Sequence, residues 1–473
     1  MSFQPRMKSQ IGLIGVGVMG SNLAQNIHEK GFRINVYDRD ENLRQRFSEF
    51  GLSASEIHAT FPGFVASLTA PRCILVMIKA GDPVDQVINH LLPLLTAGDL
   101  IVDLGNSHFQ DTERRAAKIK AAGFRYIGCG VSGGAEGARH GPAMMPGGDL
   151  SSWQQVKEVF EATAAVYEGE PCANWTGNGG AGHFVKMTHN GIEYADMQLI
   201  AEAYQLMRFT LGMDVASIAT QFERWNQGSL QSYLLEISVD ILRAEEKNGD
   251  AVIDHILDRA GQKGTGSWST HVALDYGVPT TLITAAVMAR VVSSFKAERE
   301  ALAAQTSVKA VESPYSDTQI LADIEQALYG AKIIAYAQGY QLMKAASTEN
   351  DWGLDLAAIT RSWRAGCIIR GDLLNKLLPV LASEPESEKG LLGSHLIATL
   401  STTEQETALR RVVLHGLSQA TSLPCLSAAL SYLDSIRTAT LSANMIQAQR
   451  DYFGSHGFQR IGEENEGLQH FDW

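Results

Sequence analysis

The sequence predicts an α/β Rossmann-like doubly wound N-terminal domain, followed by a large all-α domain with internal duplication and a C-terminal tail. Three observations predict this organisation. About the first 170 residues alternate between short apolar runs and helix-like segments, which is typical of a parallel sheet covered by helices. After a glycine-rich break the strand-like runs nearly vanish, and long helical segments follow. Two blocks of sequence within this helical part occur twice.

The expected strands are short apolar runs, several of them rich in β-branched side chains, at residues 11–14, 34–37, 73–78, 100–104 and 125–131. Polar and apolar residues mix between these runs and predict covering helices at 22–30, 82–95 and 111–122. Strand, helix and strand repeated at this spacing indicate parallel pairing.

The glycine-rich break at residues 175–182 marks a change of fold class. Beyond it, two matched blocks recur in the same order: 203–207 with 339–343, and 212–220 with 353–360, followed by Trp225 and Trp363 respectively. Chance similarity of Ala/Leu-rich helices is the alternative. Two matched blocks in one order favour a duplicated bundle, and their separation is too long for a solenoid unit.

Composition narrows the classes of function. The chain has 473 residues and a formal net charge of −13, and so acidic a chain argues against general binding to nucleic acid or to a membrane surface. It has no stretch of about 18 apolar residues to span a bilayer. The five cysteines form no C-x-x-C pair, so neither a disulfide framework nor a zinc site is expected, and a cytoplasmic location fits.

The first apolar run ends in Gly15-Val-Gly17-Val18-Met19-Gly20 and leads into a predicted helix. Glycines here let the backbone approach a pyrophosphate, and the helix N-terminus offers N–H donors. Asp38 ends the next strand, where an acid accepts hydrogen bonds from the ribose hydroxyls and repels a 2′-phosphate, so a turn without a ligand is the weaker interpretation. Arg39 is able to pair with such a phosphate, whereas Asp40 adds a second negative charge; the balance leans toward NAD.

Directly after the break, Lys186, His189, Asn190 and Glu193 are spaced to share one face of a helix. Such a stripe is usually the solvated side of an amphipathic helix. Here it begins at the interdomain break, where clefts form, and the mostly apolar turns over 199–206 predict a buried helix. On a partly buried face, a lysine and a glutamate have shifted pKa values and exchange protons with a ligand.

Three further segments are candidates for binding an anion. Val131-Ser132-Gly133-Gly134 is a candidate backbone nest for a carboxylate. Lys263-Gly-Thr265-Gly supplies an ammonium group, a hydroxyl and free backbone donors, and Arg290 supplies another cation. None is specific alone, because glycine-rich loops are more often plain turns.

Together these segments resemble the decarboxylating 6-phosphogluconate dehydrogenase family from residue 11 nearly to the C-terminus. The resemblance rests on several long motifs, at residues 104–107, 131–139, 140–148, 183–198, 263–266 and 446–454. It implies a Rossmann domain, a duplicated helical domain, and a tail that threads through the partner subunit of a homodimer. We therefore expect a dinucleotide-binding domain over 1–180, a substrate and dimerisation domain over 181–436, and a tail over 437–473.

The resemblance also implies residue roles. Lys186 is implied as the general base at the C3 hydroxyl of 6-phosphogluconate, and Glu193 as the general acid that protonates C1 to give ribulose 5-phosphate, without a metal. The implied substrate-binding residues are Asn106, Ser132, Gly133, Gly134, His189, Asn190, Tyr194, Lys263, Thr265 and Arg290, with Arg450 and His456 of the partner chain. The dinucleotide-binding residues expected are Gly15, Gly17, Val18, Met19, Gly20, Asp38, Arg39, Asp40, Lys79 and Asn106.

The sequence departs from the family pattern at a few positions. Gly17 replaces the usual alanine of the glycine fingerprint, and 38–40 replace an NADP-binding Asn-Arg-Thr, of which only Arg39 remains. Ser267 stands where a lysine is common, and Thr440 and Ser442 stand where arginine and proline are common. NADP preference is therefore open, whereas the expected phosphate ligands are kept.

Two other hypotheses compete with this one. A shorter, non-decarboxylating 3-hydroxyacid dehydrogenase resembles the first half and the Lys-x-x-x-Asn element, but lacks the duplicated bundle and the Arg450/His456 tail. A dinucleotide-binding protein without catalysis is disfavoured because Lys186 and Glu193 are both present.

Overall fold

A computed structural model describes residues 10–48, 56–262, 264–306, 309–382 and 392–473. The N-terminal domain contains a seven-stranded sheet in the order β3-β2-β1-β4-β5-β6-β7. Its strands are β1 (Gln10–Ile14), β2 (Arg33–Tyr37), β3 (Ile57–His58), β4 (Cys73–Val76), β5 (Leu100–Asp103), β6 (Arg125–Ser132) and β7 (Ala143–Gly148). The first six pair in parallel and β7 pairs antiparallel to β6.

The predicted doubly wound domain is confirmed, and all five expected strands are present. The run at 73–78 is a shorter strand than predicted, since β4 ends at Val76. The sequence did not predict β3, β7 or the small hairpin of β8 (Val166–Tyr167) and β9 (Glu170–Pro171). β7 carries two glycines and a proline among six residues, so it lacks the β-branched signal of the other strands.

Helices cover both faces of this sheet: α1 (Val18–Glu29), α2 (Glu41–Ser48), α3 (Phe61–Ala66), α4 (Asp82–Leu91), α5 (Phe109–Ala121), α6 (Gly134–His140) and α7 (Leu150–Thr163). The first helix begins four residues earlier than the predicted 22–30, directly at the glycine turn. The predicted helix 82–95 ends at Leu91 and continues as the 3-10 turn Leu92–Leu94, because Pro93 has no N–H to donate.

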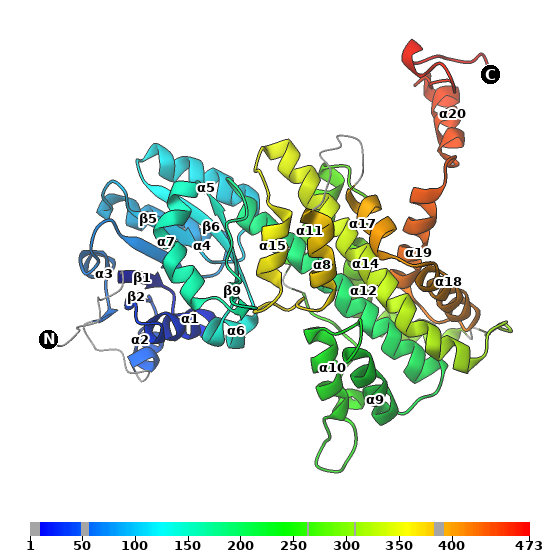
Figure 1. Cartoon of the computed structure of the whole chain (residues 1–473), viewed down its shortest axis with the longest axis horizontal. Coiled ribbons are helices and arrows are strands. Elements are labelled where there is room, and N and C mark those ends of the chain that lie inside the picture. Colours follow the sequence, from blue (N-terminus) through cyan, green and yellow to red (C-terminus); the bar gives the residue numbers. More distant parts are fainter. Residues whose placement is uncertain (1–9, 49–55, 263, 307–308, 383–391) are drawn as a thin grey trace.

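The C-terminal part is helical. It comprises α8 (Ala181–Gln205), α9 (Val215–Asn226), α10 (Tyr233–Arg243), α11 (Thr265–Asp275), α12 (Thr281–Ser294), α13 (Lys296–Gln305), α14 (Asp317–Asn350), α15 (Leu356–Trp363), α16 (Leu373–Ala382), α17 (Leu392–Leu400), α18 (Thr403–Ser418), α19 (Pro424–Arg437) and α20 (Ala443–Gly454). Figure 1 shows this domain beside the sheet domain, with α20 extending away from the body.

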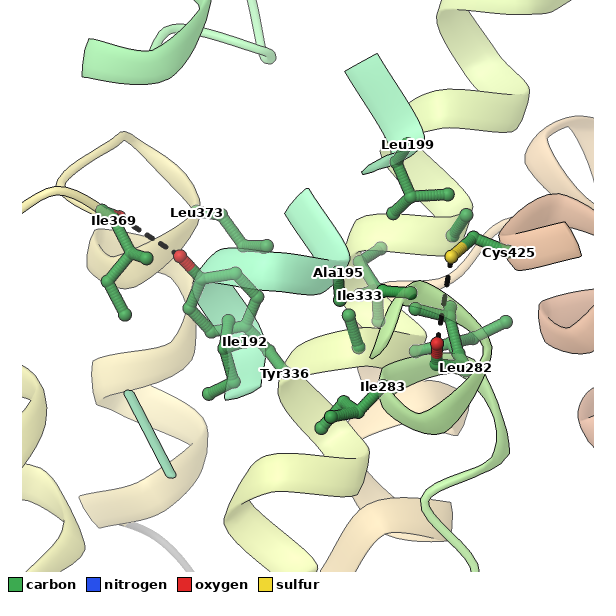
Figure 2. Close-up of a cluster of buried hydrophobic side chains, with 14 of the residues drawn as sticks. Ile192, Ala195, Leu199, Leu282, Ile283, Ile333, Tyr336, Ile369, Leu373 and Cys425 are labelled. Carbon is green, nitrogen blue, oxygen red and sulfur yellow. Dashed lines mark hydrogen bonds between the residues drawn. The ribbon is translucent and has the colours of Figure 1, made fainter. Parts of the chain in front are cut away.

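One apolar core joins the long helices α8 and α14 to their neighbours. In Figure 2, Ile192 and Ala195 of α8 lie against Ile333 and Tyr336 of α14, and the Tyr336 hydroxyl donates to the carbonyl of Ile369 at 3.0 Å. Two smaller cores fill the two faces of the sheet. No helix within the described ranges is long and apolar enough to cross a membrane.

The two sequence blocks occupy matching places in the fold. The first block lies near the C-terminal end of a long helix, α8 or α14, and the second leads into the short helix that follows, α9 or α15. The segments after these helices pair reciprocally: Tyr233 N donates to Arg370 O at 3.0 Å, and Asp372 N donates to Gln231 O at 2.9 Å. Such reciprocity is the pattern of a two-fold interface, here within one chain.

Candidate active site

The turn between β1 and α1 has the geometry that a dinucleotide requires. Gly15 has a φ of +97°, a conformation that side chains rarely adopt, and a Cβ on Gly20 would overlap the carbonyl oxygen of Gly15. A Cβ on Gly17 would instead meet nothing within 4 Å, so the space before the N-terminus of α1 is open. Val18, the first residue of that helix, is 73% exposed. Open space, free backbone and a helix N-terminus together fit a pyrophosphate.

Asp38 lies beside this turn, at the end of β2. Its Oδ2 accepts from Val16 N at 2.8 Å and its Oδ1 from Asp40 N at 2.9 Å, while Arg44 donates to its carbonyl oxygen at 2.7 Å. The carboxylate is therefore fixed next to the glycine turn. Arg39 and Asp40 are exposed, as is Lys79 in the loop after β4.

The polar stripe on α8 faces inward. Lys186 and Asn190 are each 7% exposed and His189 is fully buried, so the stripe is not a solvated face. His189 Nδ1 lies 3.4 Å from Lys186 Nζ and 3.7 Å from the Glu193 carboxylate. One imidazole nitrogen thus lies between the two groups expected to be base and acid.

Burial shifts the pKa of each of these groups. It lowers the pKa of Lys186, against the opposing effect of the Glu193 charge, and it raises the pKa of Glu193, against the opposing effect of the Lys186 charge. Burial and the Lys186 charge hold the pKa of His189 well below its usual value, so its ring is neutral. Both the lysine and the glutamate are therefore moved toward their neutral forms, as a base and an acid acting near neutral pH require.

Close backbone approach sets the position of Lys186. A Cβ on Gly130 of β6 would overlap the Cβ of Lys186, and a Cβ on Gly182 would overlap the carbonyl oxygens of Gly128 and Met145. The N-terminal turns of α8 thus lie directly on β6 and β7, which only glycine permits at these contacts.

The turn after β6 meets the same helix. Ser132 is 2% exposed, and its Oγ lies 3.3 Å from His189 Nε2. Gly133 and Gly134 have φ values of +110° and +64°, and a Cβ on Gly133 would lie 2.5 Å from Gly366 O in the helical domain. This turn leads into α6, and its Ser132 side chain joins it to His189.

Asn106 and Thr265 come from different domains but line one cavity with Lys186 and Asn190. The complete lining is Asn106, Ser107, His183, Lys186, Met187, Asn190, Thr265 and Trp268. Sequence reasoning assigned no role to Ser107, His183, Met187 and Trp268. Two of them had a usable signal, since His183 lies one turn before Lys186 on the stripe and Trp268 follows the Lys-Gly-Thr-Gly motif.

The expected phosphate ligands are partly brought together. The Arg290 guanidinium stacks on the Tyr194 ring, 3.5 Å from its centroid. Its positive charge, like that of Lys186, opposes the larger effect of burial, which raises the pKa of Glu193. Thr265 is half-buried at the start of α11. Lys263 lies outside the described residues.

Arg450 and His456 are not brought to this site within the chain. Both are exposed on the tail, and α20 extends away from the helical body (Figure 1). Hydrogen bonds within the tail hold its segments together: Asp451 is buried and accepts from His470, Trp473 and Gly457 N. Within the described ranges, no three His, Cys, Asp or Glu side chains are grouped to hold a metal ion.

Comparison with known proteins gives consistent matches along the chain. Residues 10–177 match the family model of the NAD binding domain of 6-phosphogluconate dehydrogenase, and residues 182–473 match that of its C-terminal domain. A Bacillus licheniformis protein named 6-phosphogluconate dehydrogenase, decarboxylating, is 45% identical, with 99% of this chain and 100% of that protein covered. A Bacillus subtilis relative named as the NAD(+)-dependent, decarboxylating enzyme is 46% identical at the same coverage.

A solved structure of Plasmodium falciparum 6-phosphogluconate dehydrogenase has the same fold. Its TM-score is 0.91 at 38% identity, with 98% of this chain and 100% of that chain covered. That protein is described in apo form and in complexes with NADP+ and with 6-phosphogluconate.

Proposed function

The chain belongs to the 6-phosphogluconate dehydrogenase family, and from that premise we propose how its own residues carry out the reaction. It catalyses the oxidative decarboxylation of 6-phospho-D-gluconate to D-ribulose 5-phosphate and CO₂, with reduction of a nicotinamide dinucleotide, a step of the pentose phosphate pathway. The observation that supports the residue assignment is the Lys186–His189–Glu193 row on α8, in which Lys186 and His189 are buried and Glu193 is partly buried.

Lys186 is the general base. Its neutral amine, favoured by burial, takes the proton of the substrate C3 hydroxyl. The nicotinamide ring, when bound, accepts the hydride from C3. The 3-keto acid then loses CO₂, because the ketone accepts the electron pair of the breaking C1–C2 bond as an enediol. Protonated Lys186 donates to that developing oxygen, which stabilises its negative charge.

Glu193 is the general acid that protonates the carbon that has lost CO₂, which is C2 of 6-phosphogluconate and C1 of ribulose 5-phosphate, and Lys186 takes the enediol proton as the ketone product forms. The cycle leaves Lys186 protonated and Glu193 ionised, so one proton must return from the lysine to the carboxylate. His189 Nδ1 lies between the two groups at 3.4 and 3.7 Å and is placed to pass it. No metal is needed, because the Lys186 ammonium does the polarising.

The substrate is held from three sides. The turn of Ser132, Gly133 and Gly134 binds the carboxylate of the substrate. His189 and Asn190 form hydrogen bonds with its hydroxyl groups. Tyr194, Thr265 and Arg290, with Lys263, bind the phosphate. Asn106 lies between substrate and nicotinamide, in the cavity that also holds Lys186.

NAD is the preferred coenzyme in this proposal. Gly15, Gly17, Val18, Met19 and Gly20 hold the pyrophosphate, with Lys79 at the neighbouring loop. Val16 N donates to the Asp38 carboxylate and fixes it beside that turn. There the carboxylate accepts hydrogen bonds from the ribose hydroxyls and repels a 2′-phosphate. Exposed Asp40 adds to that repulsion, and Arg39 alone opposes it. The NAD(+)-dependent name of the Bacillus subtilis relative supports this choice.

The protein is a homodimer in this proposal, and residues 437–473 of each subunit reach the other's site. The exposed apolar side chains of the tail support it, since Met445, Tyr452 and Phe453 are between 63% and 73% exposed. Arg450 and His456 would then complete the phosphate site of the partner. A cytoplasmic location is supported by five free, buried cysteines.

Initial rates with saturating 6-phosphogluconate test the proposal, with NAD and NADP titrated separately and the reduced coenzyme followed spectroscopically. We expect turnover with the higher kcat/KM for NAD, and loss of turnover but not of dinucleotide binding in Lys186→Ala. Wild-type rates in that variant would remove Lys186 as the base. Removal of residues 437–473 is expected to raise the KM for 6-phosphogluconate strongly, because Arg450 and His456 of the partner chain are then missing from the phosphate site.

A further inference from the structure

His183 lies one turn before Lys186 on α8, at the contact between the helical domain and the sheet. Its side chain is buried, with the residue 2% exposed. Its Nδ1 lies 2.6 Å from the hydroxyl of Thr112 on α5. A Cβ on Gly128 of β6 would come within 2.8 Å of the same nitrogen, so the ring is packed onto the strand.

The ring also lies against the turn that carries Asn106, where it interacts with the backbone carbonyl groups of Asp103 and Gly105. His183 Nε2 is buried and, among the described residues, has no hydrogen-bond partner. The ring lines the same cavity as Asn106 and Lys186. Burial lowers the pKa of His183, so the ring stays neutral and Nε2 does not carry a charge into the site.

The opposite side of that turn is fixed by its own domain. Asp103 accepts from Gly105 N at 3.0 Å and from Ser107 Oγ at 2.6 Å, and buried Arg115 donates to it at 3.4 Å. This network holds the turn to the sheet. These bonds lie within the N-terminal domain, and His183 is an α8 side chain that lies against the same turn, one helical turn from Lys186.

We propose that His183 is a positioning residue that, through Nε2, holds the Asn106 turn at a set separation from Lys186. The proposal rests on the function proposed above, in which Asn106 stands beside the nicotinamide and Lys186 beside C3. Hydride transfer requires the two reacting carbons about 3–3.5 Å apart, and a displacement of about 1 Å can cost a factor of about 100 in rate.

Substitution of His183 by asparagine or by glutamine distinguishes the roles of its two ring nitrogens. His183→Asn places an amide near the Nδ1 position and keeps a partner for Thr112, but it leaves the Nε2 position empty. His183→Gln reaches the Nε2 position and gives up the Thr112 contact. A residue that only supports packing through Thr112 would tolerate asparagine better, whereas the positioning role requires the reverse order.

The experiment measures kcat, KM and the primary kinetic isotope effect with 6-phosphogluconate deuterated at C3, along with the dissociation constant of the dinucleotide. We expect kcat to fall about 10- to 100-fold in His183→Asn, with a larger isotope effect and dinucleotide affinity within a few-fold of the unsubstituted protein. His183→Gln is expected to recover most of kcat. Thr112→Val, which removes the Nδ1 partner together with a hydrogen bond to the His108 carbonyl oxygen, is expected to keep the unsubstituted isotope effect.

The reverse order of the two variants, or unchanged isotope effects in both, would overturn the role of Nε2. If His183→Asn does not fold, His183→Gln decides: a kcat near that of the unsubstituted protein supports the proposal, and a kcat lowered with an unchanged isotope effect contradicts it. Failure of the unsubstituted protein to oxidise 6-phosphogluconate would instead remove the proposed function itself.

Discussion

Asp196 and Lys332 occupy the same position in the two copies of the helical duplication, and their side chains meet. Each precedes the last residue of its matched block, Met207 or Met343, by the same number of residues. The Lys332 ammonium lies 3.0 Å from the Asp196 carboxylate, with both side chains almost completely buried. Equivalent positions of two copies meet only near a two-fold axis. The sequences diverged there to opposite charges, and two like charges would have repelled each other.

Breaking this pair from one side should destabilise the protein strongly. Asp196→Asn or Lys332→Met leaves one buried charge without a partner, at a cost of about 3–5 kcal/mol in the free energy of unfolding. The double variant should recover much of that loss. Thermal and denaturant unfolding of the four proteins measure it. The exposed pair Arg410–Asp434 is the control and should contribute less than about 1 kcal/mol; equal effects at both pairs would contradict the prediction.

The acid–base pair predicts a bell-shaped dependence of kcat/KM on pH. Activity should fall at low pH as Lys186 gains a proton and at high pH as Glu193 loses one. In Glu193→Gln, kcat should fall about 10²- to 10⁴-fold and the high-pH limb should disappear. The Glu193 charge raises the pKa of Lys186, so its removal should move the low-pH limb to lower pH. A low-pH limb that stays in place would show that another group is the base.

Gly130→Ala should displace α8, the helix that carries Lys186. The added methyl group would overlap the Cβ of Lys186, and neither backbone can retreat without separating α8 from β6. We expect a destabilisation of about 1–3 kcal/mol and a loss of kcat larger than that destabilisation explains. Gly228→Ala is the control, because its new Cβ meets only an ordinary contact at 3.6 Å. Normal turnover in Gly130→Ala would contradict the proposed placement of Lys186.

Asp38→Asn should shift coenzyme preference toward NADP. The amide oxygen still accepts from Val16 N, so the turn is kept while the charge that opposes a 2′-phosphate is removed. We expect kcat/KM for NADP to rise about 10- to 100-fold, since a like-charge contact costs several kcal/mol, and that for NAD to fall. Exposed Asp240, remote in α10, serves as the matched control when changed to Asn. An unchanged ratio of kcat/KM for NADP to that for NAD would show that other residues determine the coenzyme preference.

Glu202 should give the free energy of unfolding a dependence on pH. It is fully buried and accepts from Cys425 N and Leu426 N at the start of α19, and burial raises its pKa to about 7. At pH values between the ordinary pKa of a glutamate and about 7, Glu202 keeps its proton in the folded chain but has lost it in the unfolded chain. The free energy of unfolding should therefore fall as pH rises through this range, by up to about 3 kcal/mol.

Glu202→Gln should flatten that slope, because the amide does not titrate and its oxygen still accepts a backbone N–H. Melting temperatures measured from about pH 5 to about pH 8 test this, because that range spans the raised pKa of Glu202. Glu158→Gln, an exposed change on α7, gives the baseline. Parallel curves for all three proteins would show that Glu202 titrates alike in the folded and unfolded chain.

The turn chemistry around the coenzyme was predictable from local sequence. Gly15 and Gly20 are required by a positive φ and by a carbonyl contact a few residues away, both of which leave a fixed glycine spacing. The stripe Lys186–Glu193 was predictable as one face of a helix for the same reason. β7 was missed because an antiparallel strand of glycine, proline and methionine has no local signal, and pairing with β6 forms it.

By itself the sequence determined the doubly wound domain, the duplicated helical domain, the glycine turn and the row of ionisable groups on α8, because periodicity and spacing are local properties of a chain. Only the tertiary structure decided that Lys186 and His189 of this row are buried, that Ser132 meets His189, and that Asn106 and Thr265 share a cavity with Lys186. Those relations depend on how closely α8 approaches β6 and β7. That approach is set by packing between residues far apart in sequence, and the burial it produces shifts the pKa values of Lys186 and Glu193 toward their neutral forms, which the proposed mechanism requires.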